Sequence, residues 1–127
     1  DEEVTGEYFT ANGERVRSKS EIIIADHLRR YGVVYKYEKP LELTVHGRRV
    51  TFYPDFTDMN SRTGRIYYLE HFGMMDNEDY YNAVLRKLDA FEMNQLLIGR
   101  DVLLLHESSS APLNTRVLDC YIQEYLV

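Results

Sequence analysis

"YPDFTDMNSRTGRIYYLEHFG", residues 53–73, carries two carboxylates, Asp55 and Glu70, near the ends of two apolar stretches that a turn separates. In residues 48–57, "RRVTFYPDFT", apolar and polar side chains alternate, which predicts a half-buried strand. Residues 58–64, "DMNSRTG", have the composition of a turn, and residues 65–72, "RIYYLEHF", predict another strand. If these strands pair through the turn, both carboxylates meet at one edge of a sheet.

The chain before this segment predicts a helix and a further strand. Residues 18–31, "SKSEIIIADHLRRY", start with a serine, follow a helical period and end before a glycine. Residues 33–45, "VVYKYEKPLELTV", are rich in Val and Tyr and predict a strand that is interrupted at Pro40. Together with residues 48–57 and 65–72, this strand is expected to form a three-stranded meander.

The chain after this segment predicts a helix, a strand and a last helix. Asp76 is suited to cap a helix over residues 76–94, in which apolar side chains recur at helical intervals. Residues 101–107, "DVLLLHE", predict a strand covered on both faces, placed beside strand 65–72. Residues 114–126 form an amphipathic closing segment. The expected fold class is α/β, with a central mixed β-sheet flanked by helices in the order α-β-β-β-α-β-α.

Length and composition limit the kinds of protein to consider. The 127 residues suffice for one domain, 1–127, and residue 1 is Asp rather than Met, which is compatible with excision from a longer protein. No apolar run approaches the length of a membrane span or has the form of a signal peptide. We therefore expect no association with a membrane and a cytoplasmic location. The net charge of −6 argues against a protein that coats polyanions. Cys120 lies in an apolar helical pattern, which predicts a buried structural thiol.

The acidic residues have structural as well as functional interpretations. Asp55 follows Pro54 and by itself is typical of a turn at a strand end. Glu70 lies among apolar neighbours, so its carboxylate needs a partner or a metal ion, and with Asp55 it forms the oxygen-rich setting that Mg²⁺ prefers. Glu21 completes a capping box with Ser18, yet it also lies on the helix face expected to pack on the sheet. Both interpretations of Glu21 stay open.

These residues resemble a known family. Over about residues 15–125, the order of elements and motifs resembles the PD-(D/E)XK nuclease superfamily, which has a restriction-endonuclease-like fold. The order is a helix carrying "SE", a "PDF" strand, a hairpin, a strand ending in Glu, and then helix, strand and helix. The resemblance implies that Asp55 and Glu70 bind Mg²⁺, for which Mn²⁺ can substitute. It also implies that His71 offers its main-chain carbonyl to the metal, and that Glu21 is a supporting catalytic acid.

The sequence departs from this family at the lysine. The pattern has a lysine two residues after the glutamate, on the same face of the strand, where this chain has Phe72. Lys87 lies on the apolar stripe of the following predicted helix, and in some members of the superfamily the lysine has moved to this helix. We therefore expect Lys87 to assist the attacking water, while a lysine whose stem packs and whose ammonium reaches solvent is the structural alternative. Arg86 points away from the stripe.

The implied function is a Mg²⁺-dependent nuclease that hydrolyses phosphodiester bonds, with DNA as the expected partner. Arg15, Arg17 and Lys19 precede the first helix and could grip the backbone of a nucleic acid, although a solvated basic surface explains them too. The alternative function is a catalytically inactive domain of the same fold that serves DNA or protein binding. A homodimer and a fusion to another domain are both compatible with the sequence.

Overall fold

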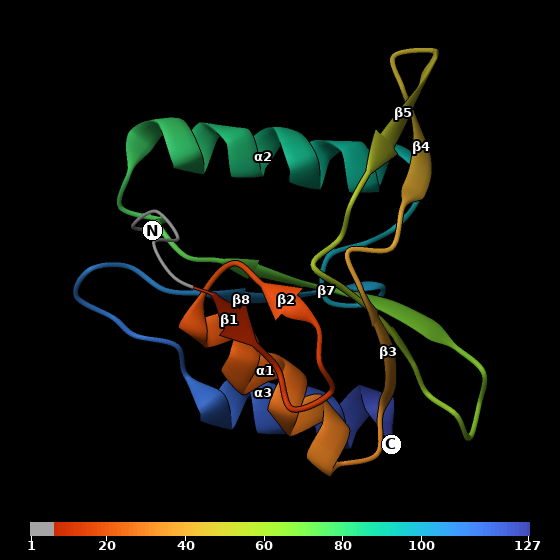
Figure 1. Ribbon diagram of the computed structural model, residues 1–127. Coiled ribbons are helices and arrows are strands. Elements are labelled where there is room, and N and C mark those ends of the chain that lie inside the picture. The colour runs from red at the N-terminus through yellow and green to blue at the C-terminus, as the bar shows by residue number, and fades with distance from the viewer. Residues whose placement is uncertain (1–6) are drawn as a thin grey trace.

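The computed structural model describes residues 7–127 and has three layers, with helix α2 above a central sheet and helices α1 and α3 below it (Figure 1). The helices are α1 (Lys19–Arg30), α2 (Glu78–Met93) and α3 (Thr115–Tyr121), which continues as a π-helical turn, η1 (Ile122–Leu126). The strands are β1 (Tyr8–Phe9), β2 (Arg15–Val16), β3 (Val34–Tyr37), β4 (Leu41–Val45), β5 (Arg48–Phe52), β6 (Phe56–Met59), β7 (Ile66–Phe72) and β8 (Val102–His106).

The central sheet is mixed, as the sequence predicts. Its strand order is β3-β6-β7-β8. The β3–β6 and β6–β7 pairs are antiparallel, and the β7–β8 pair is parallel. Helix α2 lies between β7 and β8 in the chain, since parallel neighbours need a crossover connection. The strand predicted over residues 101–107 thus pairs beside β7, and the α/β class with a mixed sheet and three helices is confirmed.

The predicted three-stranded meander is present in its pairing order, since β3 pairs with β6 and β6 with β7, both antiparallel, but its first two strands are each divided. The first predicted strand divides into β3 and β4 and the second into β5 and β6, so that β4 and β5 form a separate two-stranded hairpin. Glu38 has a positive φ of 51° and lies close to Pro40, so the extended chain ends after β3. Pro54 lacks the N–H that a ladder needs, and it separates β5 from β6. The order α-β-β-β-α-β-α therefore omits a strand division on each side of the hairpin, as well as the β1–β2 hairpin before α1.

The β4–β5 hairpin projects from the sheet beside the C-terminal end of α2 (Figure 1). Val45 pairs with Arg48 across the two-residue turn His46-Gly47, and both turn residues have positive φ, of 50° and 80°. This is the backbone of a type I′ turn, whose twist matches that of the strands. Asn94, at the end of α2, accepts from the N–H of Thr44 and donates to its carbonyl, so the hairpin is tied to the helix.

Polar side chains cap the helices near the predicted positions. Ser18 accepts a hydrogen bond from the Glu21 N–H at the start of α1, as predicted. Asn77, rather than the predicted Asp76, caps α2, because the carboxylate of Asp76 instead accepts bonds from Ser109. The predicted burial of Cys120 is wrong: its thiol is exposed, since this position of α3 faces away from the sheet.

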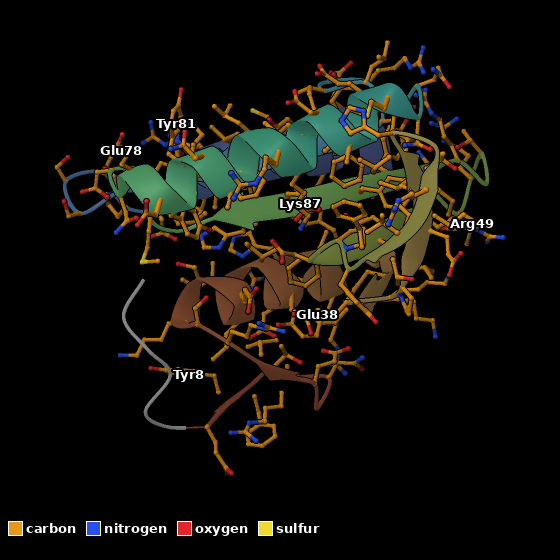
Figure 2. All side chains as sticks on the ribbon, turned by 90° about the horizontal axis from the view of Figure 1, so that it is seen from above. Tyr8, Glu38, Arg49, Glu78, Tyr81 and Lys87 are labelled. Atoms are coloured by element: carbon orange, nitrogen blue, oxygen red, sulfur yellow. The ribbon has the colours of Figure 1, made fainter. Side chains whose placement is uncertain are left out.

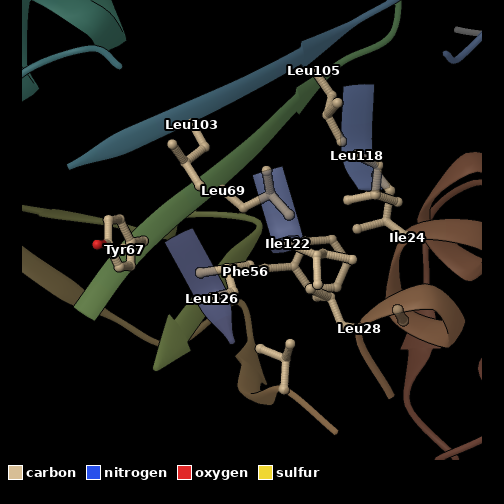
Figure 3. Packing of buried hydrophobic residues seen from close by; sticks show 12 residues of the cluster. Ile24, Leu28, Phe56, Tyr67, Leu69, Leu103, Leu105, Leu118, Ile122 and Leu126 are labelled. Carbon is tan, nitrogen blue, oxygen red and sulfur yellow. The ribbon is translucent and has the colours of Figure 1, made fainter. Parts of the chain in front are cut away.

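Two apolar cores lie on opposite faces of the sheet. The larger core joins α1 and α3 to the lower face, and Figure 3 shows Ile24 and Leu28 of α1 meeting Phe56 and the C-terminal helix. The smaller core joins α2 and the β4–β5 hairpin to the upper face through Phe91 and Leu43. Each such buried side chain contributes roughly 1.5–3 kcal/mol. Among residues 7–127, no helix combines the length and the apolar composition that crossing a membrane requires.

Candidate metal and catalytic site

Asp55 and Glu70 meet at one end of the β6–β7 pair. Phe56 pairs with Leu69, so one step further along the two chains Asp55 lies opposite Glu70. The main-chain N–H of Asp55 points at Oε1 of Glu70, with N and O 3.4 Å apart. The convergence predicted from residues 53–73 is therefore present, although Asp55 lies between β5 and β6 rather than late in one long strand.

Glu70 is a completely buried carboxylate with the ammonium group of Lys87 beside it. The side-chain nitrogen of Lys87, from α2, donates to Oε1 of Glu70 over 2.8 Å. Figure 2 places Lys87 on the side of α2 that faces β7. The other oxygen, Oε2, is buried and has no hydrogen-bond partner among the described residues. Burial raises the pKa of Glu70, and the charge of Lys87 opposes this rise.

Asp55 is held by the backbone of the neighbouring strand. Its Oδ2 accepts the N–H of His71 over 2.7 Å. Burial, and secondarily the negative charge of Glu70, raise the pKa of Asp55 to about 7, while Lys87 and the His71 N–H lower it. Two carboxyl groups this close repel each other when both are ionised, so a positive charge between them is stabilising.

His71 contributes to the site through its main chain. The N–H and C=O of one strand residue point to the same side, so the His71 carbonyl lies on the side of Asp55. Its ring points to the opposite face of the sheet from Glu70, as strand alternation predicts. There Nε2 contacts the carboxylate of Glu107, which also accepts from the hydroxyl of Ser20 over 2.6 Å. These contacts of Glu107 and Ser20 could not be predicted from the sequence, because both residues lie far from His71 along the chain.

Glu21 lies at the edge of the same group. Its side chain is buried, and Oε1 accepts the N–H of Arg17 over 2.8 Å and the hydroxyl of Tyr37 over 3.0 Å. The capping box is only half formed, because the Glu21 carboxylate reaches the amide of Arg17 rather than that of Ser18. Burial raises the pKa of Glu21, and the charge of Asp55 adds to the rise. Tyr37 was missed in the sequence, although it alternates with Tyr35 on a predicted strand.

A cavity of about 540 Å³ opens at this site. Asp55 and Lys87 lie in its wall, opposite Arg17 and Glu38. Arg17 forms an ion pair of 2.9 Å with Glu38, and Figure 2 shows Glu38 across the site from Lys87. The structure thus brings one predicted basic residue, Arg17, to the cavity.

The other two predicted basic residues do not join Arg17. Arg15 and Lys19 are exposed, and neither lies in the wall of the cavity.

The residues present suit a divalent cation in part. Oε2 of Glu70 is an orphaned buried oxygen, and Asp55 together with the His71 carbonyl adds the hard oxygen donors that Mg²⁺ prefers. Within residues 7–127, no three side chains of His, Cys, Asp or Glu cluster so as to hold a metal ion by themselves. The protein atoms available to such a cation are therefore two carboxylates and a main-chain oxygen, a set that suits Mg²⁺ because this ion keeps several waters.

Comparison with known proteins yields one relative. The chain is 30% identical, over 124 residues, to an uncharacterized protein of Methanocaldococcus jannaschii. This similarity covers 87% of the chain and 10% of the relative, so the chain spans about a tenth of that protein's length. No protein-family model matches the chain. No solved structure matches it either.

Proposed function

We propose that the protein is a Mg²⁺-dependent nuclease with a restriction-endonuclease-like fold, acting on DNA. The observation that carries this proposal is the meeting of Asp55, Glu70 and Lys87, from three separate parts of the chain, beside a cavity that Asp55 and Lys87 line. Glu21 lies close enough for the charge of Asp55 to raise its pKa. A buried carboxyl pair with a lysine costs free energy of desolvation, which a structural role alone does not explain.

Asp55, Glu70 and the His71 carbonyl would hold the cation. A divalent cation bound there supplies positive charge for a phosphodiester and acidifies a nearby water. The protein's net charge of −6 makes this neutralisation necessary, because the carboxylates would otherwise repel a polyanion. Mn²⁺ has the same ligand preferences and is expected to substitute.

Lys87 fills the role that the strand lysine has in the superfamily. Phe72 lies two residues after Glu70, is buried, and can neither donate a proton nor carry charge. The Lys87 ammonium comes to Glu70 from the helix above instead, with its side chain 23% exposed at the cavity wall. From this place it can orient a water and stabilise negative charge that develops on the phosphate. Arg17, across the cavity, is positioned to contact a flanking phosphate.

The test is a plasmid-nicking assay with Mg²⁺ or Mn²⁺. We expect cation-dependent conversion of supercoiled plasmid to nicked forms, and its loss in Asp55→Asn, whereas Asp89→Asn, an exposed acid on α2, cuts normally. Single-stranded and flap substrates belong in the same series. Cation binding without cutting of any DNA form would support the alternative, a catalytically inactive domain that binds DNA or protein.

A further inference from the structure

The upper face of the sheet has a second hollow that the site above does not include. Its volume is about 240 Å³, and it lies on the other side of the β3–β4 connection from the catalytic cavity: Glu38 lines the cavity, and Lys39 and Pro40 line the hollow. We name it the sheet groove. Its floor comes from β3, β6 and β7, and its wall from Pro40 and Leu41.

The register of the strands explains why the groove is apolar and open. Lys36, Thr57 and Tyr68 form one row across the three strands, and Val34, Met59 and Ile66 form the next. Helix α2 covers the sheet only as far as Tyr68, whose ring stacks on Phe91 with centroids 6.1 Å apart. Beyond it, Val34 is 47% exposed and Ile66 is 40% exposed, so the two apolar ends of one row on the sheet face are open to solvent.

The groove and the catalytic acids share one face of the sheet. Residues two apart on a strand point to the same side, so Asp55, Thr57 and Met59 form one line, and Glu70, Tyr68 and Ile66 form its neighbour. Each step of two residues advances by about 6.6 Å. A chain whose phosphate lies at Asp55 and Glu70 can therefore place a neighbouring unit over the groove.

Charge at the rim of the groove limits what it can take. Lys36 and Lys39 lie at its rim, and neither forms an ion pair within residues 7–127. The hydroxyl of Thr57 is buried beneath the floor, so the floor itself offers an occupant apolar contact. An occupant that matches these features has a flat apolar body and a negative charge beside it.

A nucleotide with an unpaired base has this combination. We infer that the sheet groove binds an unpaired nucleobase of the substrate strand, with its phosphate between Lys36 and Lys39, an inference that rests on the proposed function. The faces of a base are apolar, so a base can pack against apolar side chains such as Pro40 and Met59. Only an unpaired base can lay a face on the groove, because stacking within a duplex covers both faces of each base. The substrate class is then DNA with a single-stranded segment beside the cleaved bond.

The test measures binding apart from cutting. A fluorescein-labelled single-stranded oligonucleotide is titrated, with anisotropy as the readout, against Asp55→Asn, which does not cut. Ile66→Glu is expected to weaken Kd by about fivefold or more, the scale of one stacked base. Ile66→Lys retains or improves binding. Val117→Glu, which adds the same charge at an exposed site on α3, stays close to its parent.

Two further measurements make the outcome decisive. Lys36→Glu, at an exposed position, is expected to weaken binding as Ile66→Glu does, and it serves if Ile66→Glu fails to fold. A blunt duplex of the same length is expected to respond to Ile66→Glu no more than to Val117→Glu. The inference is overturned if Ile66→Glu and Val117→Glu bind the single strand equally. It is also overturned if Ile66→Lys loses binding as Ile66→Glu does, because that result indicates an apolar protein segment as the occupant. Nicking assays that fail while these differences hold would overturn the nuclease proposal alone.

Discussion

The side-chain nitrogen of Lys87 lies 2.8 Å from Oε1 of Glu70, although the two residues come from a helix and from the strand beneath it. Glu70 is fully buried, whereas the side chain of Lys87 is 23% exposed at the wall of the cavity of about 540 Å³. The lysine thus connects a carboxylate inside the protein to the space where a substrate would lie.

Lys87 is expected to be needed for cleavage. Lys87→Met keeps much of the packed stem but removes the ammonium, so we expect the cleavage rate to fall by about 100-fold or more, the scale of a lost general acid or base. Arg86→Met, at the adjacent and exposed position, is the matched control and should cut normally. Single-turnover cleavage rates measure the effect, with thermal melting to confirm folding. Unchanged cleavage by Lys87→Met would remove this lysine from the mechanism.

Asp58 is expected to lower the free energy of unfolding as the pH rises. Its carboxyl group is fully buried, and both oxygens lack a hydrogen-bond partner among residues 7–127. Burial raises the pKa of this carboxyl well above its ordinary value. The unfolded chain releases this proton above a pH of about 4, whereas the folded chain keeps it. Its contribution to the free energy of unfolding is therefore largest in acid and is lost as the pH rises towards the folded pKa.

Asp58→Leu tests this effect of pH. At neutral pH we expect the variant to be more stable than the parent by about 1–3 kcal/mol, the cost of a buried unpaired polar group. The difference should shrink as the pH falls towards 4. Urea denaturation across this pH range gives the free energies, and Asp119→Leu, at a partly exposed position on α3, is the control. A difference between Asp58→Leu and parent that stays constant with pH would refute the account of this group.

Much of the fold could be predicted, because local signals govern it. Ser18 starts α1, and the apolar run of β8 places that strand beside β7. The division of β3 from β4 was harder to predict, because Pro40 is compatible with an interrupted edge strand as well as with a break. Glu38 decides between these through its positive φ, which no composition rule predicts for glutamate.

The candidate site was partly predictable for a similar reason. Asp55 and Glu70 are adjacent through hairpin register, which the sequence pattern encodes, and Lys87 follows from the helical period. Contacts between elements distant in sequence were not predictable. The Glu107 carboxylate reaches His71 and Ser20 only once β8 has paired with β7.

Glu107 is expected to stabilise the face of the sheet below the site. Its carboxylate contacts His71 and accepts from the Ser20 hydroxyl, so it links β7, α1 and the end of β8. Glu107→Ala should lower the free energy of unfolding by about 1–3 kcal/mol, as for lost bonds to a charged group. Glu124→Ala, an exposed acid in η1, should change it little. Equal stability of the two variants in urea denaturation would contradict this role.

Asn94 is expected to hold the β4–β5 hairpin against α2. Its side chain makes bonds to both the N–H and the carbonyl of Thr44 and to the carbonyl of Ala90. Asn94→Ala should raise amide hydrogen exchange in residues 41–52, because the hairpin loses its attachment. The neighbouring variant Gln95→Ala keeps these bonds and serves as control. If exchange in residues 41–52 is the same in both variants, the hairpin is held by other contacts.

The position of a bound cation tests the central claim most directly. Crystals of the protein soaked in Mn²⁺ give an anomalous difference map in which the anomalous scattering of Mn²⁺ marks the position of the ion. We predict one dominant peak between the carboxylates of Asp55 and Glu70 and beside the His71 carbonyl, and its absence in Asp55→Asn. With Mn²⁺ bound elsewhere in the crystal, or at this place in the variant as well, the assignment of these acids as the cation site would be contradicted.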